Sequence, residues 1–210
     1  NPFLRRSKMN PSREDEKEFG DAVMKAISLS QARLRMAPAD KQALYTLGVA
    51  YGLRANYNFL VRKAYMDSLR DATQARKLHN RVTELDPSLV DARLVQGVHD
   101  YVVGSLPWHI KLVGFLAGFR GDKQQGIRTL EYVAAKGDQN RVDAEVLLCA
   151  IYRRERLPKK AVPLLEDLIQ RFPRNYILRF ELAQMYADLG DGKQALAAIR
   201  RIGAALGNGD

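Results

Sequence analysis

The sequence predicts an all-α fold built from stacked antiparallel helix hairpins, an α-solenoid. Two stretches near the C-terminus repeat with a period of 34 residues, one beginning at Glu145 and the other at Arg179. Within both, apolar residues recur at spacings of three and four, as they do on one face of a helix. Each stretch holds two such helices joined by a tight turn. Because one hairpin cannot bury its apolar face alone, the hairpins must stack.

Composition narrows the classes of function. The chain has 210 residues, enough for one domain or two small ones. Lys and Arg outnumber Asp and Glu by 34 to 24, a net charge of +10, and the surplus is spread along the chain. Nucleic-acid-binding proteins usually gather such charge on one face, so no nucleic-acid partner is expected. The single cysteine excludes a disulfide framework and a cysteine-built zinc site.

The N-terminal region is expected to contribute one helix before the repeats begin. Residues 1–12 contain prolines and scattered positive charges and are expected to be extended or disordered. Residues 13–40 place Ala22 and Ala26 among apolar residues at helical spacing and are expected to form a helix that caps the array. The compartment stays open: cytoplasmic, or periplasmic if a signal peptide was removed upstream of Asn1.

The last two units, residues 141–174 and 175–207, show the hairpin most clearly. Pro173 ends the second helix of the earlier unit, because the residue before a proline is pushed out of the α region. Gly190 marks the turn of the final hairpin. Small residues occupy the positions where two helix backbones would touch, and these are Cys149, Ala161, Ala183 and Ala195.

Two earlier units, residues 41–88 and 89–140, carry the same pattern with inserted residues. The first holds 15 additional residues, and these are expected to lengthen both helices of its hairpin. The second holds 17, and its insertion around residues 102–120 is expected to extend the first helix and to add a turn and a short apolar helix. Apolar residues of the two insertions are expected to pack on each other.

These patterns resemble the tetratricopeptide repeat (TPR) family over about residues 41–207. The residues that carry the resemblance in the first unit are Leu44-x2-Leu47-Gly48-x2-Tyr51 and Ala75-x3-His79-x2-Val82-x4-Pro87. The resemblance implies a right-handed superhelix and an interaction scaffold that binds protein segments. The apolar insertion, ending in Gly-Phe-x-Gly-Asp, is similar to a segment of TPR proteins from environmental bacteria. A looser likeness to a eukaryotic TPR family linked to inclusion-body clearance implies no function here.

The resemblance also implies a concave groove lined by the first helix of each hairpin. The lysine and asparagine clamp that some TPR domains use to bind a terminal carboxylate is absent from the corresponding positions. The expected lining is aromatic and aliphatic, which suits an apolar helix or an extended peptide. Its aromatic members are candidate anchors, with helix–helix packing as the equally weighted alternative. The candidate groove residues are Tyr45, Val49, Leu94, Tyr101, Val146, Arg153, Phe180 and Gln184.

The insertions supply a second set of candidate contacts: Arg54, Asn56, Tyr57 and Trp108. Arg54 and Asn56 lie where the first insertion begins, and they are expected either to tie the lengthened helices together or to meet a ligand. Trp108 distinguishes a packed insertion from one that serves as the binding surface. The densest basic run, residues 153–160, is expected to be a solvated turn, with binding of an anion or an acidic partner as the alternative.

No motif predicts catalysis. The sequence contains no glycine-rich phosphate loop and no nucleophile elbow, and no cofactor or metal is expected. His79 is expected to be a satisfied core or boundary histidine, and Cys149 a buried, inert thiol. The predicted function is therefore a non-catalytic scaffold for a protein or peptide partner whose identity the sequence leaves open. The alternative is a membrane-surface protein that uses the apolar insertion 102–120, without a transmembrane segment.

Overall fold

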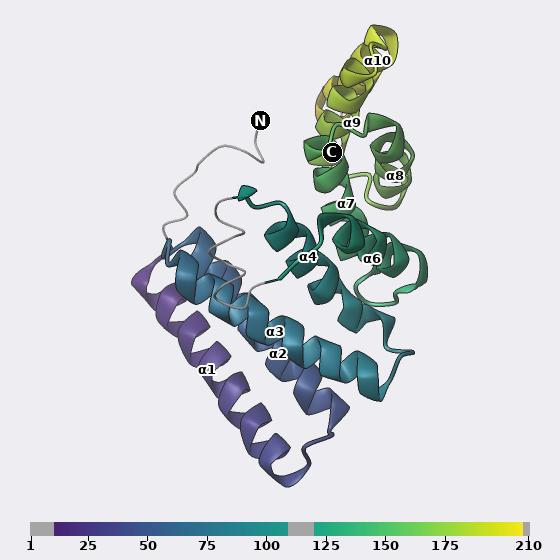
Figure 1. Ribbon diagram of the computed structural model, residues 1–210. Coiled ribbons are helices and arrows are strands. Elements are labelled where there is room, and N and C mark those ends of the chain that lie inside the picture. The colour runs from purple at the N-terminus through teal and green to yellow at the C-terminus, as the bar shows by residue number, and fades with distance from the viewer. Residues whose placement is uncertain (1–10, 109–119, 208–210) are drawn as a thin grey trace. The chain divides into compact units, whose positions relative to one another are not determined.

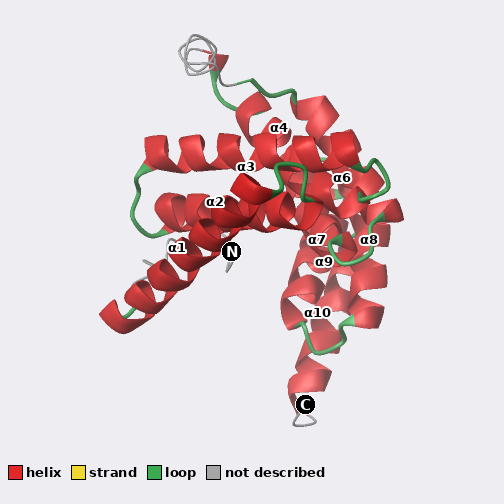
Figure 2. Ribbon diagram, turned by 90° about the horizontal axis from the view of Figure 1, so that it is seen from below, coloured by secondary structure: helices red, strands yellow, loops and turns green. Residues whose placement is uncertain are grey.

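The computed structural model describes residues 11–108 and 120–207 (Figure 1). Within these residues every regular element is a helix, and Figure 2 shows helices joined by loops with no strand among them. The predicted all-α class is confirmed for this part of the chain. The chain divides into two compact units, Asn1–Thr129 and Leu130–Asp210.

The N-terminal unit begins with helix α1 (Arg13–Met36), which packs along α2 (Lys41–Leu60). Ser12 starts α1 through a capping box, in which its Oγ accepts from the Asp15 N–H at 3.0 Å and the Asp15 carboxylate accepts from the Ser12 N–H. The core of this unit is apolar and comes from α1, α2 and α3 (Tyr65–Leu85). Its buried members include Val23, Ile27, Leu44, Leu47, Leu78 and Val82.

The first insertion lengthens both helices of its hairpin, in agreement with the sequence. Helices α2 and α3 have 20 and 21 residues, whereas α7 (Arg141–Arg154) and α8 (Pro158–Arg171) have 14 each. Figure 1 shows α2 and α3 running side by side along their whole lengths. The additional residues therefore extend a packed pair of helices.

The second insertion differs from expectation. A short 3-10 turn (Val90–Ala92) leads into α4 (Arg93–Gly104), which has only 12 residues, so the predicted extension of this helix is wrong. A reason lies at its end: a Cβ on Gly104 would lie 2.2 Å from the backbone nitrogen of Lys123, so another chain segment passes directly against it. Lys123 begins α6 (Lys123–Lys136). The predicted apolar helix falls on residues 109–119, which lie outside the described residues. The predicted packing of this helix on the first insertion therefore stays a prediction.

The C-terminal unit contains the end of α6 followed by α7, α8, α9 (Tyr176–Asp188) and α10 (Gly192–Gly207). Pro158 is the first residue of α8, a position where a missing N–H leaves no helical bond unmade. Gly190 has a φ of 79° in the turn before α10, the left-handed region that favours glycine. The small residues at the predicted helix contacts, Cys149, Ala161, Ala183 and Ala195, are all buried. Consecutive helices here stack as hairpins.

Candidate interaction surface

Helices α7 and α9 leave an exposed face with apolar side chains in the C-terminal unit. On α7, Leu148 points into the core, whereas Val146 is 41% exposed and Ala150 is also exposed. On α9, Tyr176 and Phe180 are 55% and 43% exposed, one helical turn apart. We call this face the α7/α9 surface and define it by Val146, Ala150, Arg153, Tyr176, Phe180 and Gln184.

An ion pair fixes the two helices of the α7/α9 surface to each other. Arg153 Nη1 on α7 lies 2.7 Å from both carboxylate oxygens of Glu181 on α9. Both side chains are partly buried, so the pair is less screened by water than a fully exposed one. Arg153 therefore acts first as a strut between the helices.

The aromatic part of the surface is also held in place. The rings of Tyr176 and Phe180 meet edge to face, with centroids 6.3 Å apart and an interplanar angle of 87°. Gln184, one turn further along α9, donates to the Asp188 carboxylate at 2.8 Å. The exposed rings are thus oriented by contacts within their own helix, which lowers the entropy lost when a partner covers them.

In the N-terminal unit the predicted groove residues differ in exposure. Val49 is 37% exposed, and Tyr45 and Leu94 are half-buried. The ring of Tyr45 packs edge-on against the ring of His79, with centroids 5.1 Å apart. Tyr101 is only 5% exposed, so its predicted role as an anchor does not fit this structure.

The cause of the burial of Tyr101 is a close helix crossing. A Cβ on Gly126 of α6 would lie 2.4 Å from the backbone nitrogen of Tyr101 and 2.7 Å from the carbonyl oxygen of Gly97. Only a residue without a side chain allows α6 to approach α4 this closely. The crossing covers the part of α4 that the repeat pattern assigns to the groove.

The insertion contacts have different surroundings. Arg54 donates to both carboxylate oxygens of Asp71 on α3, at 2.8 and 2.7 Å, and its guanidinium lies 5.0 Å from the centre of the Tyr51 ring. Tyr57 packs against Phe19 of α1, with ring centroids 4.9 Å apart. Arg54 therefore ties the lengthened helices together, the first of the two roles that the sequence left open.

Asn56 and Trp108 lie on the outside of the molecule. Asn56 is exposed on α2, and Trp108 is 78% exposed directly before the residues that the structure leaves undescribed. The structure thus brings Arg54 and Tyr57 into packed positions, and it leaves Asn56 and Trp108 at the surface.

The candidate reactive side chains are buried. Burial raises the pKa of the Cys149 thiol to about 12, so the nucleophilic thiolate is suppressed at neutral pH. His79 is 1% exposed, and desolvation lowers its pKa to about 4. The burial agrees with the expected core position, and neither ring nitrogen has a hydrogen-bond partner among the described residues. Among the described residues, no group of His, Cys, Asp or Glu is arranged to hold a metal ion.

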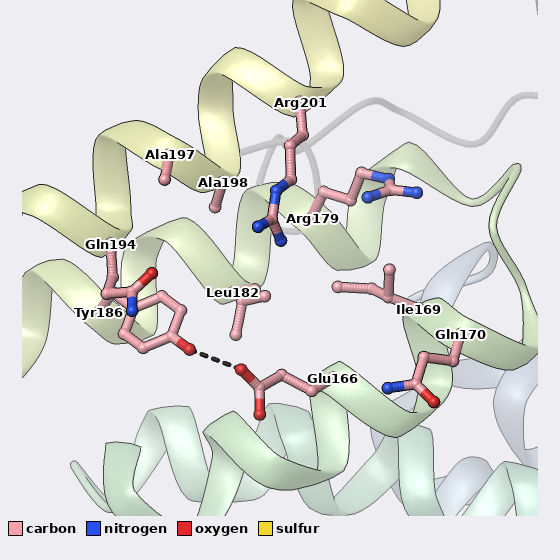
Figure 3. A pocket seen from close by; sticks show the side chains of 10 residues that line it. All are labelled: Glu166, Ile169, Gln170, Arg179, Leu182, Tyr186, Gln194, Ala197, Ala198 and Arg201. Atoms are coloured by element: carbon pink, nitrogen blue, oxygen red, sulfur yellow. Dashed lines mark hydrogen bonds between the residues drawn. The ribbon is translucent and has the colours of Figure 1, made fainter.

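A pocket that sequence reasoning missed lies between α8, α9 and α10 (Figure 3). It has a volume of about 400 Å³ and contains none of the predicted groove residues. Its polar lining includes Glu166, Arg179, Tyr186 and Arg201. The basic run at residues 153–160 lies elsewhere: it spans the end of α7, the turn and the start of α8.

No helix within residues 11–108 and 120–207 combines the length and the apolar character that crossing a bilayer requires. The membrane-surface alternative depends on the insertion 102–120, most of which lies outside the described residues.

Comparison with known proteins finds a family match in the C-terminal part of the chain. Residues 152–209 match the tetratricopeptide repeat family model, and no curated protein matches the chain. A crystal structure of MamA protein aligns with 89% of this chain and 84% of its own, at 19% identity and a TM-score of 0.58. A second MamA crystal structure aligns with 91% of this chain and 93% of its own, at 18% identity and a TM-score of 0.58. At such identities the likeness concerns the fold.

Proposed function

We propose that this chain, a tetratricopeptide repeat protein, is a non-catalytic interaction scaffold whose α7/α9 surface binds an apolar segment of a partner protein. The observation that carries the proposal is the pair of exposed rings, Tyr176 and Phe180, held edge to face beside the Arg153–Glu181 strut. The tetratricopeptide repeat match at residues 152–209 supports it, because this match includes all of α9.

The free energy gained by burying apolar area favours aromatic and aliphatic anchor residues on the α7/α9 surface. Burying a large apolar side chain that is otherwise exposed stabilises a complex by about 1.5–3 kcal/mol. Phe180 and Val146 provide such area on two different helices. Ala150 is a small exposed residue on α7, so it leaves room beside it for a side chain of the partner.

The Arg153–Glu181 pair adds specificity at this surface. Arg153 and Glu181 neutralise each other's charge, so the surface between the apolar residues is polar but carries no net charge. An apolar segment carrying one hydrogen-bonding group fits this pattern better than a strongly charged segment, since a charge here would have to compete with an existing ion pair. The expected partner segment is therefore an amphipathic helix or an extended peptide with aliphatic side chains.

The same proposal assigns a contact role in the N-terminal unit to Tyr45, Val49 and Leu94. Val49 is the most exposed of the three. Tyr101 is left out because α6 covers it.

Peptide selection followed by surface mutation tests the proposal. Peptides selected from a random library on the full chain are expected to be rich in aliphatic and aromatic residues. Phe180→Glu and Val146→Glu are each expected to weaken binding of a selected peptide by tenfold or more, which corresponds to about 1.4 kcal/mol. Leu196→Glu is the matched control, because Leu196 is a 57% exposed apolar residue on α10, outside the α7/α9 surface.

Two outcomes would contradict the proposed function. One is that selected peptides bind Phe180→Glu and Val146→Glu as tightly as the unchanged chain. The other is that Leu196→Glu weakens binding as much as the two surface variants do. Circular dichroism of all three variants checks that the helices are retained.

A further inference from the structure

The pocket between α8, α9 and α10 runs along the final hairpin. Its lining extends over two turns of α9, from Arg179 to Tyr186, and over two turns of α10, from Gln194 to Arg201. At 1.5 Å per residue, each of these stretches is about 10 Å long. At about 3.3 Å per residue, an extended chain would place roughly three residues along such a trough.

The two arginines of the pocket share one end of it. Helices α9 and α10 are antiparallel around the turn at Gly190, so residues equally far from the turn lie at the same level. Arg179 and Arg201 form one such level, and Tyr186 and Gln194 form another. Figure 3 shows Arg201 reaching from α10 into the opening, above Leu182, whereas the side chain of Arg179 begins beside it and carries its guanidinium group away from Arg201.

Neither arginine is neutralised by a carboxylate within the described chain. Arg179 donates from Nη2 to the carbonyl oxygen of Pro173 at 3.3 Å, and this leaves its other N–H groups for a ligand. No ion pair joins Arg201 to a described residue, and its positive charge opposes the rise in the pKa of Tyr186. By contrast, Arg153 and Arg171 of the same unit are each paired with acidic side chains. Two uncompensated guanidinium groups at one end of a pocket favour an anion there.

The other end of the pocket carries a negative charge, that of Glu166. Tyr186 Oη donates to Glu166 Oε1 at 2.6 Å, and this contact with a carboxylate raises the pKa of Tyr186 to about 12. The negative charge of Glu166 would repel a second anion. Between the two ends, the lining is apolar and is formed by Ile169, Leu182, Ala197 and Ala198.

We propose that this pocket binds an acidic peptide segment of a partner protein, with one glutamate or aspartate carboxylate held between Arg179 and Arg201 and small apolar residues lying over Leu182 and Ala198. The charge pattern selects a segment with its acidic group at one end. A uniformly acidic segment fits less well, because Glu166 repels its far end. Gln170 and Gln194 supply amide groups for the peptide backbone.

This pocket is distinct from the α7/α9 surface. Successive residues of a helix are rotated by roughly 100°, which places Arg179, Leu182 and Tyr186 on one side of α9. Phe180 and Gln184 lie on the other side. A partner on one face of α9 would therefore leave the other face open, and the two proposals can fail independently.

An NMR titration of the full chain with a defined probe tests the proposal. The probe is a short peptide with one glutamate followed by alanine and valine residues, acetylated and amidated so that the side chain carries its only charge. Addition is expected to shift the amide signals around Arg179 and Arg201. Arg179→Gln and Arg201→Gln are each expected to weaken binding about tenfold. Arg200→Gln is the matched control: it removes the same charge from the neighbouring exposed residue, which does not line the pocket.

Altered probes, competition with phosphate and the Arg200→Gln control can each overturn the proposal. A glutamine version of the probe that binds equally well would show that the carboxylate is not recognised. A glutamine version with a free C-terminus that binds more tightly would assign the pocket to terminal carboxylates. Inorganic phosphate that displaces the probe at equal concentration would show that the pocket holds an anion alone. An equal loss of binding in Arg200→Gln would mean that the net charge of +10 attracts the probe nonspecifically.

Discussion

Arg54 on α2 and Asp71 on α3 form a bidentate ion pair, with Nε–Oδ2 and Nη2–Oδ1 distances of 2.8 and 2.7 Å. Asn58 Nδ2 donates to the same carboxylate at 3.1 Å. The carboxylate of Asp71 is nearly buried, and its hydrogen bonds with Arg54 raise the pKa of the guanidinium. The contact lies in the part of the hairpin that the first insertion lengthens, and it holds α2 and α3 together there.

Removing Asp71 is expected to destabilise this lengthened hairpin. Asp71→Ala leaves a partly buried guanidinium and the buried amide of Asn58 without their acceptor, which is expected to cost about 3 kcal/mol. Urea unfolding followed by circular dichroism measures the loss. Asp67→Ala is the control, because Asp67 is exposed and lies 3.6 Å from Arg70, and it is expected to change stability by less than about 0.5 kcal/mol. Equal losses in the two variants would contradict a special role for the ion pair.

The buried ring of His79 is expected to make the N-terminal unit sensitive to acid. Desolvation lowers its pKa to about 4 in the folded chain, whereas an unfolded histidine titrates near 6.5. Between these pH values the unfolded state binds more protons, so stability falls as pH drops from about 6.5 to about 4. A difference of this size corresponds to about 3 kcal/mol.

The measurement for His79 compares unfolding at several pH values in the unchanged chain and in His79→Leu. The leucine variant is expected to lose most of the pH dependence in this window. A variant that keeps the full dependence would show that other groups cause it. The ring of His79 packs directly against the backbone of α2 at Gly48, where a Cβ would lie 2.7 Å from the ring.

Two glycines are expected to respond in opposite ways to alanine. Gly126→Ala places a methyl group 2.4 Å from the Tyr101 backbone nitrogen, so α6 must shift away from α4, at a cost of roughly 3 kcal/mol. Gly20→Ala in α1 has no heavy atom within 4 Å of the new group and is expected to raise stability by about 0.5–1 kcal/mol through helix propensity. Thermal unfolding distinguishes them. A Gly126→Ala chain that is as stable as the unchanged one would mean that the crossing can open without cost.

The sequence predicts those helices whose ends are marked by local signals. Pro173 and Gly190 delimit α9 and its neighbours, and the structure places helix ends beside both. The end of α4 also has a local signal, Pro107, three residues beyond Gly104, but the close approach of Lys123 to Gly104 is a tertiary contact that no local signal predicts. The burial of Tyr101 has the same origin: its position in the repeat indicates the groove, but the crossing at Gly126 is a long-range feature.

The pocket of the final hairpin was not predicted for a related reason. Arg179 occupies a position of the repeat pattern and Arg201 lies on the following helix, so no short motif joins them. The signal that could have found them is their equal distance from Gly190, which an antiparallel hairpin converts into proximity. Charge counts along the chain show no surplus in residues 175–210, and this balance hides the fact that the two arginines line one pocket without carboxylate partners.

Hydrogen exchange of the full chain with and without a library-selected peptide tests the central claim most directly. The account predicts slower exchange in residues 141–154 and 176–188, the helices that carry Val146 and Phe180, with little change in α8. In the Phe180→Glu chain this protection is expected to disappear. Protection that spares both α7 and α9 while the peptide is bound would contradict the assignment of the α7/α9 surface.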